Sequence, residues 1–264
     1  MRKFTTPALL IALTAAWTAG HLAGQAPRAQ APARGLPSAE SILDRYVEVT
    51  GGKAAYEQHT SEIIMGTMAF PEQGLSGRLT RYAMAPDKEY SVVELGPIGK
   101  IESGVVDGVA WEKSAILGPR IKSGDEKDQA MREARFNAAV EWRKLYTKAV
   151  TASKEAVNGE ECYKVTLTPA TGKPENQFYS VKTGLLLKTT ATAVSPMGDV
   201  PVEVEVSDYK KFGGVLYPTR SKQKAGEQEL DITITSVSLD EPVPPQYFEL
   251  PADVKAVLEK PAAK

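Results

Sequence analysis

From Ser61 to Leu239 the chain alternates apolar and polar residues with a period of two. After Val200, for example, valines fall on every second position, and Glu203 and Glu205 lie between them. Successive side chains of a β-strand point to opposite faces, so this pattern predicts strands that are dry on one face and wet on the other. About a dozen such segments are bounded by turn residues. They span residues 61–70, 75–85, 88–95, 98–106, 108–114, 148–157, 160–168, 175–181, 184–194, 199–210, 214–224 and 227–239.

Short turns between these segments predict that successive strands are antiparallel neighbours. Asp107-Gly108 and Asn158-Gly159 are dipeptides that two-residue hairpins prefer, because both turn positions need a positive φ. Open twisted sheets of more than about ten strands rarely stay flat. The predicted fold class is therefore mainly β with helices (α+β). We expect a half-open antiparallel β-barrel of about a dozen strands, with helices covering or plugging the concave face.

Two stretches have helical rather than strand-like spacing. Ser38 can cap a helix whose apolar residues recur at helical spacing until Gly51-Gly52, and a short helix is expected over 53–57. Residues 125–146 open with acidic residues and continue as one or two amphipathic helices, with Asn137 as an expected break. About a dozen strands enclose more space than their own side chains fill. We therefore expect these helices to cover the interior.

The helical segment and one loop supply the candidate cavity residues. Trp142 and Tyr146 lie four apart, so one helical face can direct both into the same space. Ile116 and Leu117 are apolar in a connection where polar residues are the rule. The candidate ligand-binding residues of the cavity and its lid are Trp111, Ile116, Leu117, Met131, Phe136, Trp142, Leu145 and Tyr146. The alternative is that these side chains pack the core and contact no ligand.

Residues 1–26 are typical of a secretory signal peptide. Arg2 and Lys3 precede an apolar run over 7–19, and small residues follow it. The apolar run is too short to span a membrane stably, and no later stretch approaches the roughly 18 apolar residues that a membrane helix needs. We therefore expect a secreted protein without a transmembrane segment, periplasmic if the source is a Gram-negative bacterium.

The rest of the chain shows no composition break that would separate two domains. Residues 27–37 are rich in Pro, Ala, Arg and Gln and predict a flexible linker. Residues 38–251 are expected to form one domain that ends in an extended clamp over 241–251, and residues 252–264 a frayed C-terminal tail. The expected protein is a monomer.

Charge and rare residues exclude several classes of function. The net charge of -1 gives no general attraction for nucleic acid. One cysteine and two histidines cannot build a disulfide framework or a usual structural zinc site within one chain. Cys162 is expected to be a strand residue without chemistry, and His59 an exposed or capping side chain at a helix end. Patterns of metalloproteases, serine hydrolases and P-loop enzymes are absent, so we expect no catalytic residue, metal or cofactor.

One stretch resembles a known family. Residues 206–220, VSDYKKFGGVLYPTR, form an expected hairpin with its turn at Gly213-Gly214, and they are similar to a strand-turn-strand of the outer-membrane lipoprotein-sorting (LolA-like) proteins. The opening Ile42-Leu43-Asp44-Arg45-Tyr46 and Thr50-Gly51-Gly52 are also similar to secreted bacterial members. The resemblance implies an unclosed antiparallel barrel whose helices cover a hydrophobic cavity, and acyl-chain binding for that fold.

Three functions follow from these observations. The first is a non-catalytic periplasmic carrier or sensor that binds a lipid, an acyl chain or a lipidated protein in a hydrophobic cavity, since each buried CH₂ contributes about 0.8 kcal/mol. The second is a structural or protein-interaction module of the cell envelope, with an envelope protein as its partner at a strand edge. The third is a carboxylate-dependent hydrolase, because Asp and Glu are the only abundant acid–base groups.

Overall fold

The computed structural model describes residues 35–195 and 198–259. The predicted signal peptide (1–26) and most of the predicted linker (27–37) lie outside the described residues. In the part of the chain that the structure describes, the twelve predicted strands and one further strand form a 13-stranded sheet in which every pair of neighbours is antiparallel. The strands are β1 (Ser61–Phe70), β2 (Leu75–Met84), β3 (Lys88–Glu94), β4 (Lys100–Val106), β5 (Val109–Ser114), β6 (Gly118–Ile121), β7 (Tyr146–Val157), β8 (Glu160–Pro169), β9 (Glu175–Ser180), β10 (Leu186–Ala193), β11 (Val200–Phe212), β12 (Val215–Ala225) and β13 (Gln228–Leu239).

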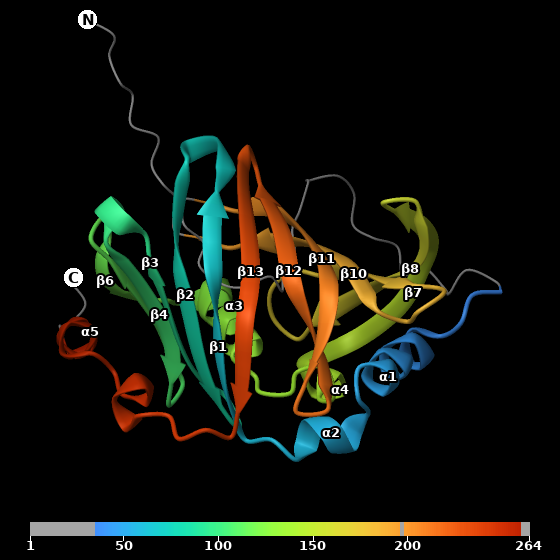
Figure 1. Cartoon of the computed structure of the whole chain (residues 1–264), viewed down its shortest axis with the longest axis horizontal. Coiled ribbons are helices and arrows are strands. Elements are labelled where there is room, and N and C mark those ends of the chain that lie inside the picture. The colour runs from blue at the N-terminus through green and yellow to red at the C-terminus, as the bar shows by residue number, and fades with distance from the viewer. Residues whose placement is uncertain (1–34, 196–197, 260–264) are drawn as a thin grey trace, which may run out of the picture.

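The order of the strands explains how one sheet uses both halves of the chain. Neighbours run β6-β5-β4-β3-β2-β1-β13-β12-β11-β10-β9-β8-β7, so β1 pairs with β13 and joins the two meanders. β6 and β7 are the free edges and do not pair with each other, so the sheet is open. Figure 1 shows the sheet curving around α3 and α4. The expected mainly β, unclosed architecture with a few helices is confirmed.

The helices are short and few. They are α1 (Ala39–Val49), α2 (Lys53–Glu57), α3 (Gly124–Glu133), α4 (Trp142–Leu145) and α5 (Ala252–Leu258), with 3-10 turns η1 (Pro71–Gln73), η2 (Gly96–Ile98) and η3 (Pro245–Phe248). The Ser38 side chain caps α1 by accepting a hydrogen bond from the Ser41 amide. Asn137 has a φ of 57°, which ends the helical path between α3 and α4 as the sequence predicts.

The apolar residues form separate clusters on the concave side of the sheet. One cluster lies on β1 to β4 and β13, and it includes Met68, Val93 and Ile232. A second joins α1 and α4 to β8, β9 and β10. A third packs α3 against β4 and β5 through Ala130, Val105 and Ala110. The helices therefore pack against both halves of the sheet.

One expectation for the chain's end is wrong. Residues 252–258 form α5 rather than a frayed tail, because Val254 is fully buried and the helix packs against the edge strand β6. β6 itself was not expected, since its four residues include Pro119 and lack alternation. The clamp over 241–251 contains η3, and its Tyr247 stacks on Tyr82 with 4.1 Å between ring centroids.

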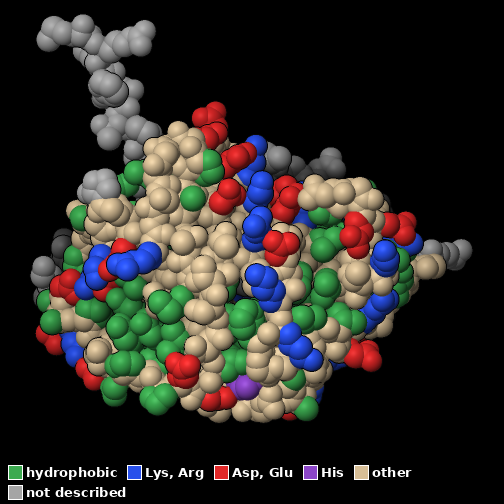
Figure 2. All heavy atoms as spheres, viewed as in Figure 1, with side chains coloured by type: hydrophobic (Ala, Val, Ile, Leu, Met, Phe, Trp, Pro, Cys, Tyr) green, Lys and Arg blue, Asp and Glu red, His purple; other side chains and the backbone are tan. Residues whose placement is uncertain are grey.

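Figure 2 shows acidic and basic side chains interspersed on the outward surface of the sheet. The ion pairs there cross between neighbouring strands, as in Lys188–Glu203 at 2.6 Å and Lys224–Glu229 at 3.9 Å. Such exposed pairs contribute about 0–1 kcal/mol each, and they make a solvated face. No helix among the described residues is both long and apolar enough to cross a membrane.

Candidate functional site

A cavity of about 320 Å³ lies between the concave face of the sheet, α1 and the segment from Arg132 to Tyr146. Ligand pockets in proteins commonly measure about 300–1,000 Å³, so this space is large enough for a small amphiphile. Its apolar wall comes from α1, the helical segment and the inner positions of β1, β2, β11 and β13. The main apolar lining residues are Leu43, Ile64, Met68, Leu79, Phe136, Trp142, Leu145, Val206, Leu230, Ile232, Ile234 and Val237.

Four of the residues predicted from the sequence line this cavity together. They are Phe136, Trp142, Leu145 and Tyr146. α4 ends at Leu145 and β7 begins at Tyr146, so a turn of helix and the first residue of a strand supply them. Their contact with a ligand stays a prediction.

Contacts of Trp142 with Asp44 and Arg143 hold this part of the cavity wall in place. Its indole Nε1 donates to Asp44 of α1 at 3.4 Å, and the Arg143 guanidinium lies 4.2 Å from its ring centroid. Arg143 also binds both oxygens of Asp44, at 2.9 and 2.7 Å. The hydrogen bond from Arg143 holds the pKa of Asp44 below its usual value. α1 and α4 are thereby fixed to each other beside the cavity.

The other four predicted residues do not line the cavity. Met131 packs beside Val105 and Ala110 of β4 and β5. Ile116 and Leu117 lie in the turn between β5 and β6, where they are 59% and 60% exposed. They are separated from the cavity lining, and the loop that carries them contributes nothing to it.

Trp111 is the clearest correction, because it lies on the outward face of the sheet. Its ring covers Gly104, where an added Cβ would come within 3.0 Å of the indole Nε1. It also packs 6.1 Å from Tyr90, which in turn lies 5.1 Å from Tyr247 of the clamp. Trp111 is fully buried, and the aromatic group that it belongs to extends through Tyr90 to Tyr247. Alternation places it opposite to Ala110, and the spacing alone does not say which of the two faces is concave.

A buried charged cluster occupies one end of the cavity wall. Arg81 donates from Nε and Nη2 to Glu89, at 3.0 and 2.8 Å, and from Nη1 to Glu62. Tyr217 of β12 donates to the second oxygen of Glu62 at 3.0 Å. Burial would lower the pKa of Arg81, but Glu89 and Glu62 together raise it above its usual range. All four residues line the cavity.

The sequence contained a signal for this cluster. Arg81 stands between Leu79 and Ala83 in the alternation of β2, and both of these apolar side chains are buried. Charged residues at such positions must pair, because an isolated buried ion costs several kcal/mol. Both carboxylates are bound to one guanidinium, which leaves neither as a separate acid or base. The acidic pairs that the sequence offers elsewhere form outward contacts, as in Lys154–Glu161 at 2.9 Å.

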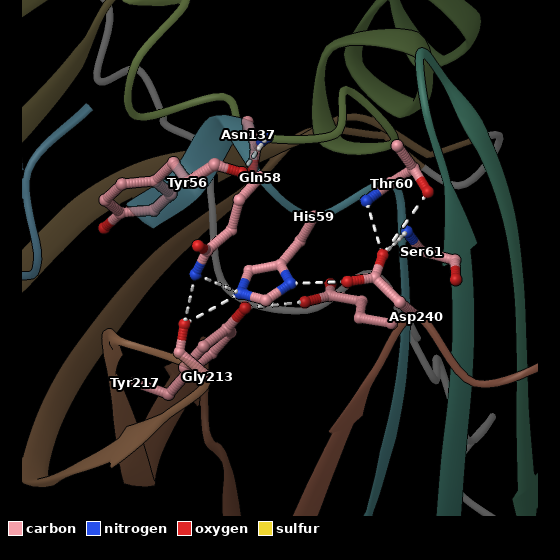
Figure 3. Close-up of polar contacts among 10 residues, drawn as sticks. Tyr56, Gln58, His59, Thr60, Ser61, Asn137, Gly213, Tyr217 and Asp240 are labelled. Carbon is pink, nitrogen blue, oxygen red and sulfur yellow. Dashed lines mark hydrogen bonds and ion pairs between the residues drawn. The ribbon is translucent and has the colours of Figure 1, made fainter. Parts of the chain in front are cut away.

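His59 lies beside this charged end and joins three segments (Figure 3). Its Nδ1 lies 2.6 Å from Asp240 Oδ2 at the end of β13, and its Nε2 lies 2.7 Å from the Gly213 carbonyl oxygen between β11 and β12. An imidazole that donates from both nitrogens makes both contacts, so the geometry favours the protonated form. The sequence predicted an exposed or capping side chain, whereas the His59 side chain is only 13% exposed and lies between Asp240 and Gly213.

The titration of His59 follows from these contacts. Burial alone lowers the pKa of the imidazole, but the hydrogen bonds to Asp240 and Gly213 and the charges of Asp240 and Glu62 raise it above its usual value of 6.5. Asp240 in turn accepts hydrogen bonds from the Thr60 amide at 2.8 Å and from His59, and its pKa is lowered. Both shifts of pKa favour the charged form of the pair.

A second buried carboxylate lies behind the cavity wall. Glu175 is 1% exposed and accepts hydrogen bonds from Tyr146 at 2.9 Å and from the Gln177 amide at 2.5 Å. Burial raises the pKa of Glu175 to about 6, although these hydrogen bonds and the charge of Arg132 act in the opposite direction. Tyr179 completes the network by donating to Gln177.

The described residues offer no ready metal site. No group of three or more His, Cys, Asp and Glu side chains in this part of the chain is placed to hold a metal ion. Cys162 is fully buried and packs with Val157 and Phe178 on the outward side of β8, as expected for a strand residue. Polar side chains also line the cavity, among them Gln177, Ser221 and Gln223.

No protein-family model matches the chain, and no curated protein matches it in sequence. Three solved structures share its fold. A DUF1329 family protein from Desulfovibrio piger has a TM-score of 0.56 at 17% identity, covering 80% of this chain and 97% of that one. A LolA superfamily protein from Nitrosomonas europaea has a TM-score of 0.55 at 13% identity, covering 81% and 99%.

The third is a putative outer membrane lipoprotein-sorting protein domain from Vibrio parahaemolyticus. It has a TM-score of 0.52 at 13% identity and covers 84% of this chain and 100% of that one. Such identities show the fold alone, and the fold is the LolA-like one that the hairpin around Gly213-Gly214 predicted. That hairpin is β11–β12, whose Tyr217 lines the cavity.

Proposed function

We propose that this protein is a secreted, non-catalytic carrier or sensor that binds a lipid, an acyl chain or a lipidated protein in the cavity. The observation that carries the proposal is the apolar space between the concave sheet and the helices. Inward residues of β1 and β13, such as Ile64, Ile234 and Val237, are only partly buried and line this space. An acyl chain that covers them would be stabilised by about 0.8 kcal/mol per buried CH₂.

The shared fold and the sequence add support of a more general kind. Two of the similar structures are described as a LolA superfamily protein and a lipoprotein-sorting domain. An N-terminal signal peptide over 1–26 would place the mature protein outside the cytoplasm, in the periplasm of a Gram-negative source. A cavity of this size favours the carrier over an interaction module whose interior is filled by side chains.

Ile64 and Ile63 give a matched pair of variants, because they are adjacent on β1 and point to opposite faces. Ile64 lines the cavity, whereas Ile63 is opposite Tyr82 in the pairing of β1 with β2. We expect the wild type to bind the apolar fluorophore N-phenylnaphthylamine saturably and monopalmitoylglycerol to displace it. In Ile64→Glu the affinity should fall at least about tenfold, since a charge enters the apolar wall.

Ile63→Glu is the control, and it should keep wild-type affinity. Circular dichroism and thermal unfolding of both variants check that the fold is retained. Absence of saturable binding to any neutral or charged amphiphile by the wild type would contradict the carrier proposal. Equal loss in both variants would show that the cavity is not where the probe binds.

A further inference from the structure

Gln223 of β12 carries a buried hydrogen-bond donor that nothing in the described structure satisfies. The residue is 8% exposed and lines the cavity, and its amide nitrogen Nε2 has no hydrogen-bond partner. In the sheet it stands between Val204 of β11 and Leu230 of β13, so both directly opposite neighbours are apolar. The amide therefore faces the cavity from an apolar part of the wall.

The other glutamine of the cavity wall, Gln177, has an amide group whose nitrogen and oxygen are both hydrogen bonded. Gln177 of β9 donates to Glu175 at 2.5 Å and accepts a hydrogen bond from Tyr179. Both of its polar atoms are thus used inside the protein. Leaving a buried donor unpaired normally costs a folded protein free energy, and each such group calls for an explanation. A ligand that enters the cavity can supply the missing acceptor.

We propose that Gln223 recognises the bound amphiphile by donating a hydrogen bond to a neutral carbonyl oxygen, as in an acyl ester or an acyl amide. This proposal rests on the proposed function of the cavity. The residues directly opposite Gln223 are Val204 and Leu230, which carry no charge. Tyr217 of the charged cluster is six residues away along β12, roughly 20 Å. A neutral acceptor matches these immediate neighbours, since burying an unpaired ion beside them is costly.

This placement also sets the direction of the ligand. With its carbonyl at Gln223, the hydrocarbon chain can run along the apolar inner positions of β13 and β1, which include Ile232, Ile234 and Met68. A bare hydrocarbon would fill the same space but would leave the amide of Gln223 unpaired, and an ether lacks the carbonyl oxygen that this amide would bind. The cavity should therefore discriminate an acyl ester from its ether analogue by a single hydrogen bond.

The test compares monopalmitoylglycerol with its ether analogue, monohexadecylglycerol, by displacement of N-phenylnaphthylamine. The two probes have similar length and the same glycerol head, and only the ester has the carbonyl. We expect the wild type to bind the ester about five- to tenfold more tightly, the value of one buried neutral hydrogen bond. In Gln223→Met the two affinities should become equal, with the affinity for the ether retained.

Gln177→Met is the matched control. It removes a glutamine from the same wall whose amide is already paired, so the preference for the ester should remain. Thermal unfolding separates a structural role, because Gln223→Met should be at least as stable as the wild type, whereas Gln177→Met should be less stable.

The other outcomes each overturn a different statement. Equal binding of ester and ether by the wild type overturns the role of Gln223 and leaves the carrier function standing. A preference for the ester that persists in Gln223→Met assigns the carbonyl to another residue. If neither probe nor the fluorophore binds, the proposed function itself fails.

Discussion

Glu175 shows how the environment of one residue couples this fold to pH. Its pKa rises from 4.5 to about 6 because the carboxyl group is buried. Between these two values the folded protein binds a proton that the unfolded chain has released, so stability falls as the pH rises through this window. A shift of about 1.5 pH units corresponds to about 2 kcal/mol.

We therefore expect Glu175→Gln to remove this dependence. The new amide oxygen can still accept from Tyr146 and Gln177, so the network is kept. The free energy of unfolding of the variant minus that of the wild type should rise by about 2 kcal/mol between pH 4 and pH 7.5. Urea unfolding at several pH values measures this difference. A difference that does not change with pH would mean that the carboxyl group titrates normally.

Trp111 and Phe136 show how far the position of a single side chain can be predicted from the sequence. The sequence predicted that both belong to the cavity or its lid. Both are buried, but only Phe136 lines the cavity. For Trp111 the alternating pattern defined two faces but not their curvature. The aromatic group on its face extends through Tyr90 to Tyr247, more than a hundred positions later in the chain. Gln223 was not singled out, because an unpaired amide is visible only once its neighbours across the sheet are known.

At the scale of elements, local signals predicted most of what the structure contains. The cap at Ser38, the hairpin at Asp107-Gly108 and the break at Asn137 act within a few residues, and each is confirmed. β6 and α5 were missed because they depend on each other: a four-residue strand is stable there since the helix with Val254 covers it. Contacts between segments distant in sequence leave no periodic signal.

His59 acts at this same scale, because it holds the start of β1 to the ends of β11 and β13. Its pKa is raised in the folded protein, so the contact contributes full stability below the unfolded value of about 6.5. That contribution is lost as the pH rises through the folded pKa. We expect the stability advantage of the wild type over His59→Gln to be constant in mild acid and to shrink above neutral pH.

Urea unfolding of both proteins from pH 5 to pH 9 measures this advantage, and an NMR titration of the imidazole reports its pKa directly. Asp240→Asn is the control, since loss of the carboxylate should bring the pKa of His59 down. An imidazole pKa at or below 6.5 in the wild type would contradict the arrangement in Figure 3.

At the scale of the whole molecule, the pairing of β1 with β13 makes one sheet out of two meanders. Among the described strands it is the only pairing between β1–β6 and β7–β13. The cavity depends on it, because Ile64 and Met68 on β1 face the same space as Ile232 on β13. The sequence predicted the strands and their meanders, but it did not predict this junction, whose partners lie at opposite ends of the domain.

Gly66 lies at the centre of that junction, where the register shifts after Met65. A Cβ at position 66 would lie 2.4 Å from the carbonyl oxygen of Thr233, so a side chain must push β1 and β13 apart. We expect Gly66→Ala to lower the free energy of unfolding by about 1–3 kcal/mol, the usual cost of overpacking, and to weaken binding of N-phenylnaphthylamine as the cavity wall separates. Thr67→Ala, at the exposed next position, should change stability by less than about 0.5 kcal/mol. Unfolding is followed by Trp fluorescence and by far-UV circular dichroism. If the junction makes the sheet one cooperative unit, the two signals should give coincident transitions in both variants. Two separate transitions in the wild type would show that the halves fold independently.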